Sequence, residues 1–251
     1  MVCEGMPFKS NDMLLVDYAI FVKETGELVD TTIESLARQH KKYEEGRVYG
    51  PELLVVGEGR YIRGFEEAVS GVEELGKKYE VEIPPDKAYG ERDPDKVRVF
   101  PARLFLKNNI TPDVGKEVTI NNAVGRIIAV TGGRVTVDFN HPLAGKTLKA
   151  EFTVIKKLED NEEKVRYLIK RRIKTLDVSA VKVSLKSGEG VVEVELPKDY
   201  RFSENIQITK YLISRDILKW LEGFKEVVFI ERFESAEFRG GEASASREET
   251  T

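Results

Sequence analysis

LLVVGEGRYIRGFEEAVSGV, residues 53–72, is the stretch around which the rest of the chain is organised. Its first four residues predict a short buried strand, and Gly57 and Gly59 indicate a turn. The apolar residues that follow recur at helical spacing, at Phe65, Ala68, Val69 and Val72. A helix of one or two turns is marginal alone and depends on tertiary packing. We therefore expect a sheet that wraps around this helix.

Periodicity alone also fits a generic strand–turn–helix connection, but four further segments favour a more specific interpretation. They are VDY at 16–18, LVD at 28–30, AYG at 88–90 and NHPLAGKTL at 140–148. Together with GEGRYIRGFEEAV at 57–69, and in this order, they resemble the FKBP-type peptidyl-prolyl isomerases. The last segment is similar to the SlyD-like branch, whose members carry an extra domain in the flap. The chain most resembles the long archaeal members of this family.

Composition bounds the possible classes of protein. The 251 residues suffice for two or three modest domains, and the net charge of -4 argues against nucleic acid as the main partner. Cys3 is the single cysteine, which excludes an internal disulfide and indicates a reducing cytosol. The sequence shows no signal-peptide pattern, and its apolar runs are too short to span a bilayer. We expect a cytoplasmic protein without membrane association.

The resemblance covers residues 8–158, and the strand patterns there agree with it. We expect strands at residues 13–22, 28–30, 53–56, 78–83 and 147–157. In the first of them, one face carries Leu14, Val16, Tyr18 and Ile20. Residues 31–50 are polar and irregular, which predicts a surface excursion that interrupts a strand. His40 within it has no second histidine or cysteine nearby, so we interpret it as a surface residue.

Residues 91–139 predict a small all-β unit inserted into the flap. VRVFPARLF, KEVTI, GRIIAV and RVTVDF indicate short strands, and Gly132-Gly133 is a hairpin signal between the last two. The resemblance implies that the insert binds unfolded chains, so we expect its apolar residues to divide between a small core and an exposed client-binding patch, a division that the sequence leaves open. They are Val97, Val99, Phe100, Phe105, Ile110, Ile127 and Ile128.

Residues 159–236 predict a third unit with the order α-β-β-α-β. Asp160 and Glu163 form a capping-box pattern ahead of a helix with an apolar stripe. Strands at 178–185 and 191–196, a helix at 204–221 and a strand at 226–233 follow. Residues 237–251 are small and polar, which indicates a disordered tail.

The predicted fold class is therefore α+β. An FKBP-like antiparallel sheet wraps on a short helix, with an inserted small all-β flap domain and a C-terminal α/β domain. The expected boundaries are 1–90 plus 140–158 for the isomerase domain, 91–139 for the insert, 159–236 for the C-terminal domain and 237–251 for the tail.

The resemblance implies an aromatic pocket for a proline ring. Phe65 would form its floor, and Tyr18 and Tyr89 would line its walls, with the Tyr89 hydroxyl donating to a substrate carbonyl. The backbone N–H of Ile62 would bind a second carbonyl. Ordinary amphipathic packing at a domain edge is the alternative interpretation of these tyrosines.

Further substrate contacts implied by the resemblance involve Tyr61 beside Ile62 and Asp30 near the amide carbonyl. Val29 would complete the wall where many members have an aromatic residue. The last strand usually brings a phenylalanine into the pocket, but here that position is Ala150, with Phe152 two residues on and on the same face. This departure puts the strength of catalysis in question.

Prolyl isomerisation needs no nucleophile, metal or cofactor, and we expect none. The C-terminal tail contains neither histidine nor cysteine, so the nickel site of some bacterial relatives is not implied here. The predicted function is peptidyl-prolyl cis-trans isomerisation and chaperoning of unfolded or proline-containing polypeptides. The alternative is a holdase with a catalytically weak proline pocket, favoured by Ala150 and Val29.

Two partner predictions concern the C-terminal unit. Its helices and exposed sheet edge favour a homodimer through 159–236. Residues 164–174 are rich in lysine and arginine, which fits either a site for RNA, the ribosome or an acidic partner, or a solvated helix face. The acidic balance of the remaining chain favours the solvated face.

Overall fold

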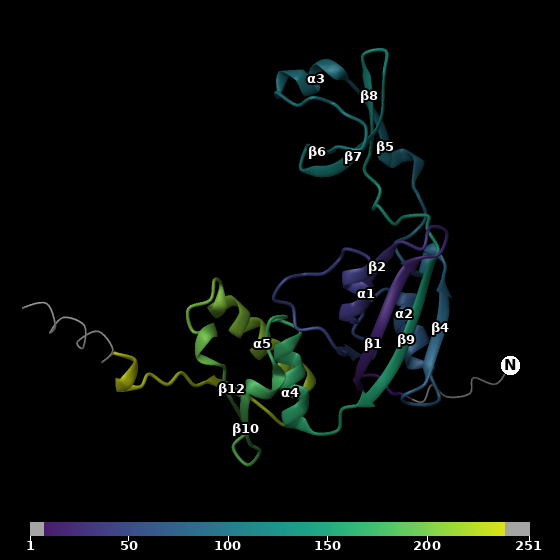
Figure 1. The fold of residues 1–251 in the computed structure, drawn as a ribbon. Helices are drawn as coiled ribbons and strands as arrows, with labels where there is room; N and C mark the ends of the chain where they lie inside the picture. The colour runs from purple at the N-terminus through teal and green to yellow at the C-terminus, as the bar shows by residue number, and fades with distance from the viewer. Residues whose placement is uncertain (1–7, 239–251) are drawn as a thin grey trace, which may run out of the picture.

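The computed structural model describes residues 8–238, and three sheets organise them. Figure 1 shows the insert projecting from one end of the central sheet, while the C-terminal unit lies beside the other end. Cys3 lies outside the described residues, as does the predicted tail from residue 239 onward. The tail does not begin at 237, because Ser235–Glu237 form a 3-10 turn in which Glu237 pairs with Arg201 at 2.8 Å.

The central sheet is built on β1 (Met13–Val22). β9 (Leu148–Lys157) runs antiparallel along one side of it, and β4 (Lys78–Ile83) pairs with β9 beyond. On the other side, β2 (Leu28–Thr31) and β3 (Glu52–Val55) each pair with one part of β1. The chain between β2 and β3 therefore interrupts what would otherwise be one strand, as the sequence predicts.

That interruption is more ordered than its polar sequence indicates. It contains α1 (Glu34–Gln39), and the Val48 N–H donates a 3.0 Å hydrogen bond to the Lys174 carbonyl of the C-terminal unit. His40 is partly exposed and lies edge-on to Phe21, with 5.8 Å between the ring centroids. The segment is a surface excursion, as predicted, but it also carries a helix and contacts the C-terminal unit.

The short helix α2 (Arg63–Ser70) packs against the concave face of the sheet, as predicted. Phe65 and Val69 are fully buried in a core with residues of β1, β3 and β9. Gly64 allows the close approach to β4, because an added Cβ would lie 2.5 Å from Ile83 Cγ2. The loop after β4 contains the 3-10 turn Pro85–Lys87.

The insert is a four-stranded antiparallel sheet in the order β5-β8-β7-β6. Its strands are β5 (Val97–Pro101), β6 (Glu117–Ile120), β7 (Ala123–Thr131) and β8 (Arg134–Asp138), preceded by the 3-10 turn Pro94–Lys96. Gly132 and Gly133 form the predicted hairpin, with φ of 57° and 74°.

One part of the insert differs from the all-β prediction. VRVFPARLF is a strand only as far as Pro101, and α3 (Ala102–Lys107) follows. Proline supplies no N–H to continue a ladder, and ARLFLK consists almost entirely of good helix formers. Phe105 on this helix is buried with Ile127 in the insert core, whereas Val99 is 58% exposed and Ile128 40% exposed.

The C-terminal unit has the predicted α-β-β-α-β order. It comprises α4 (Asn161–Lys170), β10 (Lys182–Lys186), β11 (Val191–Glu195), α5 (Ile206–Trp220) and β12 (Glu226–Phe229), with a 3-10 turn at Lys198–Tyr200. β11 pairs antiparallel with β10 and parallel with β12. The predicted strand from 178 begins only at 182, because the Asp177 side chain caps a 3-10 turn, Val178–Ala180.

The C-terminal unit and the central sheet share one hydrophobic core. Met13 and Leu15 on β1, with Leu53 and Val55 on β3, belong to the same buried cluster as the apolar face of α4. Alternate residues of β1 therefore face two different cores, one on each side of the sheet. This packing fixes α4 against the sheet.

Candidate active site

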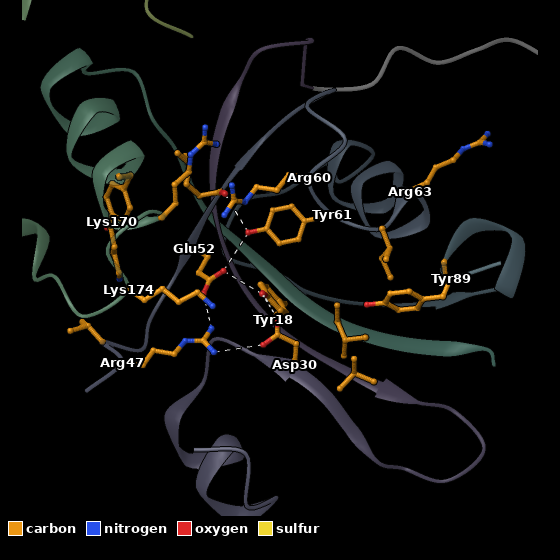
Figure 2. A pocket seen from close by; sticks show the side chains of 18 residues that line it. Tyr18, Asp30, Arg47, Glu52, Arg60, Tyr61, Arg63, Tyr89, Lys170 and Lys174 are labelled. Carbon is orange, nitrogen blue, oxygen red and sulfur yellow. Dashed lines mark hydrogen bonds and ion pairs between the residues drawn. The ribbon is translucent and has the colours of Figure 1, made fainter. Parts of the chain in front are cut away.

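A cleft of about 580 Å³ opens on the concave side of the central sheet, and Figure 2 shows the side chains that line it. Its volume is in the range of ligand-binding pockets in proteins. The walls come from β1 to β3, the loop before α2, the turn at Tyr89 and the C-terminal unit. The lining residues are Tyr18, Ile20, Val29, Asp30, Arg47, Val48, Glu52, Leu53, Arg60, Tyr61, Ile62, Arg63, Ala88, Tyr89, Tyr167, Lys170, Arg171 and Lys174.

Six of the residues singled out from the sequence line this cleft: Tyr18, Val29, Asp30, Tyr61, Ile62 and Tyr89. Phe65 lies beneath them, with its ring centroid 5.3 Å from that of Tyr18 and 5.7 Å from that of Tyr61. It is fully buried, so it supports the tyrosines from below.

Ala150 and Phe152 lie behind this aromatic layer and do not line the cleft. Ala150 is buried on β9, opposite Ile20 on β1 and Val81 on β4. The Phe152 ring stands edge-on to Phe65 at 5.5 Å. Phe152, the large side chain on β9, therefore packs beneath Phe65 and does not enter the cleft.

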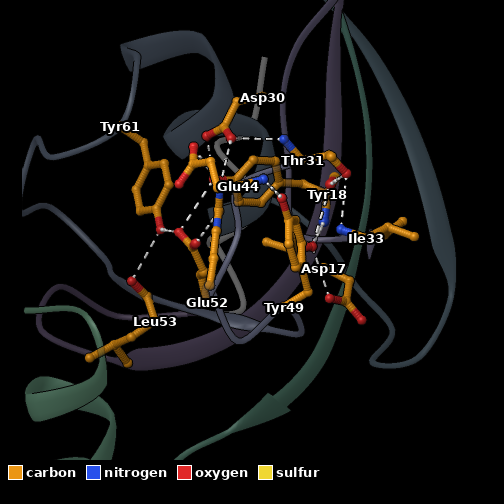
Figure 3. Close-up of polar contacts among 12 residues, drawn as sticks. Asp17, Tyr18, Asp30, Thr31, Ile33, Glu44, Tyr49, Glu52, Leu53 and Tyr61 are labelled. Atoms are coloured by element: carbon orange, nitrogen blue, oxygen red, sulfur yellow. Dashed lines mark hydrogen bonds and ion pairs between the residues drawn. The ribbon is translucent and has the colours of Figure 1, made fainter. Parts of the chain in front are cut away.

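A polar network crosses the base of the cleft, as Figure 3 shows. The Tyr18 hydroxyl donates a 2.8 Å hydrogen bond to Asp30 and lies 3.4 Å from a carboxylate oxygen of Glu52. The Tyr61 hydroxyl donates to the Leu53 carbonyl at 3.3 Å. Burial, and then the Glu52 charge, raise the pKa of both phenols far above neutrality. Both hydroxyls therefore remain protonated donors at neutral pH.

Arg47 is the cation of this network, and its side chain is only 7% exposed. It pairs with Glu52 at 2.7 Å and with Asp30 at 3.8 Å. Neither Arg47 nor Glu52 was predicted as a site residue, because both belong to charged surroundings without a periodic pattern. The hydrogen bond from the Tyr18 N–H to Thr32 Oγ1, at 2.9 Å, helps to hold the chain beside Asp30 in place.

The loop before α2 presents the backbone of Ile62 to the cleft. Within residues 8–238 the Ile62 N–H donates to no protein group, so it is available to a bound carbonyl. The preceding turn is held by Glu66, a largely buried carboxylate that accepts hydrogen bonds from the N–H groups of Gly57 at 2.6 Å and Gly59 at 3.2 Å.

Tyr89 lies at the cleft side opposite α4 (Figure 2) and stacks on His141. The ring centroids are 4.2 Å apart and the planes are nearly parallel. Burial raises the pKa of Tyr89, and no hydrogen bond of its hydroxyl is found within residues 8–238. The stacking orients this hydroxyl, and His141 comes from the segment NHPLAGKTL that follows the insert.

The C-terminal unit supplies the remaining wall, through Tyr167, Lys170, Arg171 and Lys174. The sequence favoured a solvated face for the basic residues of 164–174; Lys174 is exposed as that interpretation expects, whereas Lys170 and Arg171 are partly or largely buried. Arg171 is only 4% exposed, and it pairs with Glu58 and with Asp216 on α5, each at 2.8 Å. The shared core turns this face of α4 toward the cleft.

Three protein-family models together match nearly all of these units. The model of the FKBP-type peptidyl-prolyl cis-trans isomerase matches residues 6–106, that of the FKBP26 IF domain matches 98–143, and that of the FKBP26 C-terminal region matches 161–234. The chain is 42% identical to the short-type peptidyl-prolyl cis-trans isomerase of Methanocaldococcus jannaschii over 146 residues, which are 58% of this chain and 90% of that protein. The chain belongs to the FKBP-type peptidyl-prolyl cis-trans isomerase family.

Bacterial relatives agree with this assignment. The chain is 33% identical to a probable FKBP-type 16 kDa isomerase of Pseudomonas fluorescens, over 53% of this chain and 80% of that protein. It is 35% identical to the SlyD isomerase of Treponema pallidum, over 52% of this chain and 68% of that protein. The predicted family, fold class and enzyme class are therefore confirmed.

An FKBP-type isomerase acts on proline-containing polypeptides. Between residues 8 and 238, no group of three or more histidine, cysteine, aspartate or glutamate side chains has the geometry to hold a metal ion. In the same range, no helix is both long and apolar enough to cross a membrane.

Proposed function

We propose that this cleft binds Xaa–Pro segments of unfolded or partly folded proteins and catalyses their cis-trans isomerisation. The observation that carries the proposal is the aromatic layer of Tyr18, Tyr61 and Phe65 under an open cleft, with the Ile62 N–H at its rim. A proline ring fits against the Tyr18 and Tyr61 rings that line the cleft, with Phe65 supporting both from beneath.

The chemistry follows from the amide bond. Rotation about Xaa–Pro has a barrier of about 20 kcal/mol, because the planar amide is stabilised by resonance. In the twisted transition state this resonance is lost and the amide becomes less dipolar. A cleft that excludes water from the amide therefore favours the twisted form over the planar one.

Donors at the cleft hold the flanking carbonyl groups. We assign one carbonyl to the Ile62 N–H and another to the Tyr89 hydroxyl, since both residues line the cleft. Asp30 faces the amide carbonyl, and Val29 completes the wall beside it. Ala150 and Phe152 contribute by packing beneath the floor, through Ile20 and Phe65.

The insert recruits clients in this proposal. Its core is built around Phe105 and Ile127, and several apolar side chains remain outside that core. Besides Val99 and Ile128, the exposed ones are Leu104, Leu106, Val114, Val124 and Val130. Such a concentration of exposed apolar surface on a small unit is typical of a site for unfolded chains.

A deletion separates catalysis from recruitment. Residues 91–139 are replaced by a short loop, which the geometry permits because the Gly145 N–H donates to the Gly90 carbonyl at 2.9 Å. We expect this variant to retain peptide isomerisation but to lose its catalysis of refolding that is limited by proline isomerisation. A second variant, with Val99 and Leu106 changed to serine, should reproduce the refolding defect. Refolding catalysis that survives both changes would remove the role of the insert.

A holdase with a weak pocket is the second candidate, and it is favoured by Val29, a non-aromatic residue in the cleft wall. The discriminating measurement is peptide isomerisation by the intact protein. A holdase suppresses aggregation without accelerating cis-trans exchange, whereas the proposed enzyme does both.

The remaining proposals concern assembly and place of action. We propose an isomerase domain at residues 1–90 with 140–158, an insert domain at 91–139 and a C-terminal domain at 159–236. We also propose that the protein forms a homodimer through the C-terminal domain and that it is cytoplasmic. Phe202, Tyr211 and Phe233 are exposed on the C-terminal unit and supply an apolar surface for a second copy. Sedimentation of the intact protein and of a Phe202→Ser, Tyr211→Ser variant tests the dimer. Since Arg171 is engaged internally, nucleic acid remains the less favoured partner.

A further inference from the structure

The wall that α4 and the following residues contribute to the cleft is unusually basic for this chain. The cleft lining contains six cationic side chains and two carboxylates, although the whole chain carries a net charge of -4. The two carboxylates, Asp30 and Glu52, are both engaged by Arg47. The excess positive charge therefore comes from other residues.

Three of these cations have no partner of opposite charge. Lys170, Lys174 and Arg60 line the cleft, and none of them forms an ion pair within the part of the chain that is described. By contrast, Arg63 pairs with Glu67 and Arg171 with Glu58 and Asp216. In Figure 2, Lys170 and Lys174 lie on the side of the cleft opposite Tyr89.

Lys170 is held in an environment that disfavours its charge. It is partly buried, and this burial lowers the pKa of its ammonium group, although the charges of Glu52, Asp177 and Asp17 act in the opposite direction. The rigid packing of α4 against the sheet keeps it there. A carboxylate brought to this wall would gain an ion pair and would relieve the repulsion between cations.

We propose that Lys170 and Lys174, with Arg60, form a subsite that selects acidic side chains close to the proline of a client. This inference rests on the proposed function of the cleft. Tyr18, Lys170 and Lys174 line the same cleft, so an extended chain, which advances about 3.3–3.6 Å per residue, can place a side chain a few positions from the proline against the α4 wall. The C-terminal unit thus contributes to substrate selection.

The test uses peptides of the form Xaa–Pro that are identical except for Glu, Gln or Lys placed two positions before or two positions after the proline. Exchange NMR gives kcat/KM for the intact protein at low salt. In one of the two series, kcat/KM for the Glu peptide should exceed that for the Gln peptide by about threefold to tenfold. In the same series, kcat/KM for the Lys peptide should be lower than that for the Gln peptide. Because the cleft is open to solvent, 0.5 M salt should reduce this preference.

Variants assign the preference to the subsite. Lys170→Gln with Lys174→Gln should bring the Glu-to-Gln ratio close to one, and Lys170→Glu with Lys174→Glu should favour the Lys peptide. Lys164→Gln is the matched control, because Lys164 is a lysine of the same helix that does not line the cleft, and it should keep the original ratio.

Two outcomes overturn the inference without affecting the proposed isomerase function. The first is equal kcat/KM for the Glu and Gln peptides in both series, and the second is an unchanged Glu-to-Gln ratio of kcat/KM in the double variants. If no peptide is isomerised, the proposed function fails, and calorimetric binding of the same peptides then decides the subsite. Tighter binding of the Glu peptide supports it, and equal binding of Glu and Gln peptides overturns it.

Discussion

The Tyr18 hydroxyl donates a 2.8 Å hydrogen bond to the Asp30 carboxylate, across the pair of strands β1 and β2. Tyr18 is nearly fully buried, whereas Asp30 is open to the cleft. The bond therefore links the aromatic layer to the polar group that faces a substrate. It also fixes the direction of a carboxylate that Arg47 approaches from the other side at 3.8 Å.

Tyr18→Phe tests this link. The ring and its packing on Phe65 remain, but the hydrogen bond to Asp30 is lost. We expect kcat/KM for peptide isomerisation to fall about tenfold, which corresponds to about 1.4 kcal/mol. Tyr79→Phe is the control, since its hydroxyl bonds to the Glu74 backbone outside the cleft. Equal activity of the two variants would contradict a catalytic role for the Tyr18–Asp30 pair.

Glu66 is predicted to stabilise the turn that leads into the cleft. Glu66→Ala leaves the N–H groups of Gly57 and Gly59 without their acceptor, and we expect a loss of about 1–3 kcal/mol in the free energy of unfolding. Glu67→Ala, one residue on, breaks only exposed ion pairs to Arg63 and Lys87, which contribute about 0–1 kcal/mol. Urea denaturation of both variants measures the difference; similar losses would refute the assignment.

The Arg171–Asp216 pair is predicted to support the junction between the units, because Arg171 also contacts Glu58. Asp216→Asn removes the carboxylate that Arg171 and Arg172 share and leaves Glu58 to compensate the buried Arg171, so we expect a loss of about 3 kcal/mol at pH 7. Burial alone would raise the pKa of Asp216, but Arg171 and Arg172 outweigh this effect and lower it below the ordinary value.

The lowered pKa predicts how this contribution depends on pH. It is fully present above the pKa of the unfolded chain, about 3.9, and is lost as the pH falls through the lower folded value. The difference in unfolding free energy between the parent protein and Asp216→Asn should therefore be constant near neutrality and shrink below about pH 4. A difference that grows on acidification would contradict the assigned direction.

Asn140 is predicted to hold the two connections of the insert together. Its amide accepts from the Asp93 N–H and donates to the Asp93 carbonyl, both at 2.9 Å. Asn140→Ala should loosen the insert, so hydrogen exchange of the flanking segments should rise and refolding catalysis should fall, while peptide isomerisation changes less than twofold. A parallel loss of both activities would show that Asn140 acts on the cleft itself.

Much of this architecture can be predicted from the sequence where periodicity and motifs coincide. The stretch 53–72 gives the strand, turn and helix, and Gly132-Gly133 gives the hairpin. The helix after Pro101 was not predicted, because RLF in an apolar run fits a strand as well as a helix. Only the preceding proline, which has no N–H to continue a strand ladder, favours the helix.

The site was predictable only in part. Tyr18, Asp30, Tyr61 and Tyr89 follow from their motifs, whereas the contribution of α4 depends on packing between units distant in sequence. Residues 164–174 carry both the apolar stripe that packs on β1 and the cations that face the cleft. The spacing of apolar residues along α4 does not show which element the stripe packs against. The contribution of its cations to the cleft is therefore seen only in the structure.

The most direct test of the account is exchange NMR on an Ala-Xaa-Pro-type peptide, with the intact protein and a Val29→Arg variant. Val29 lines the cleft without being part of the buried core, so the arginine should obstruct proline binding while the protein stays folded. We predict that the intact protein accelerates cis-trans exchange and that the variant loses at least tenfold of this activity. No acceleration by the intact protein, or full activity of a folded Val29→Arg variant, would contradict catalysis in this cleft.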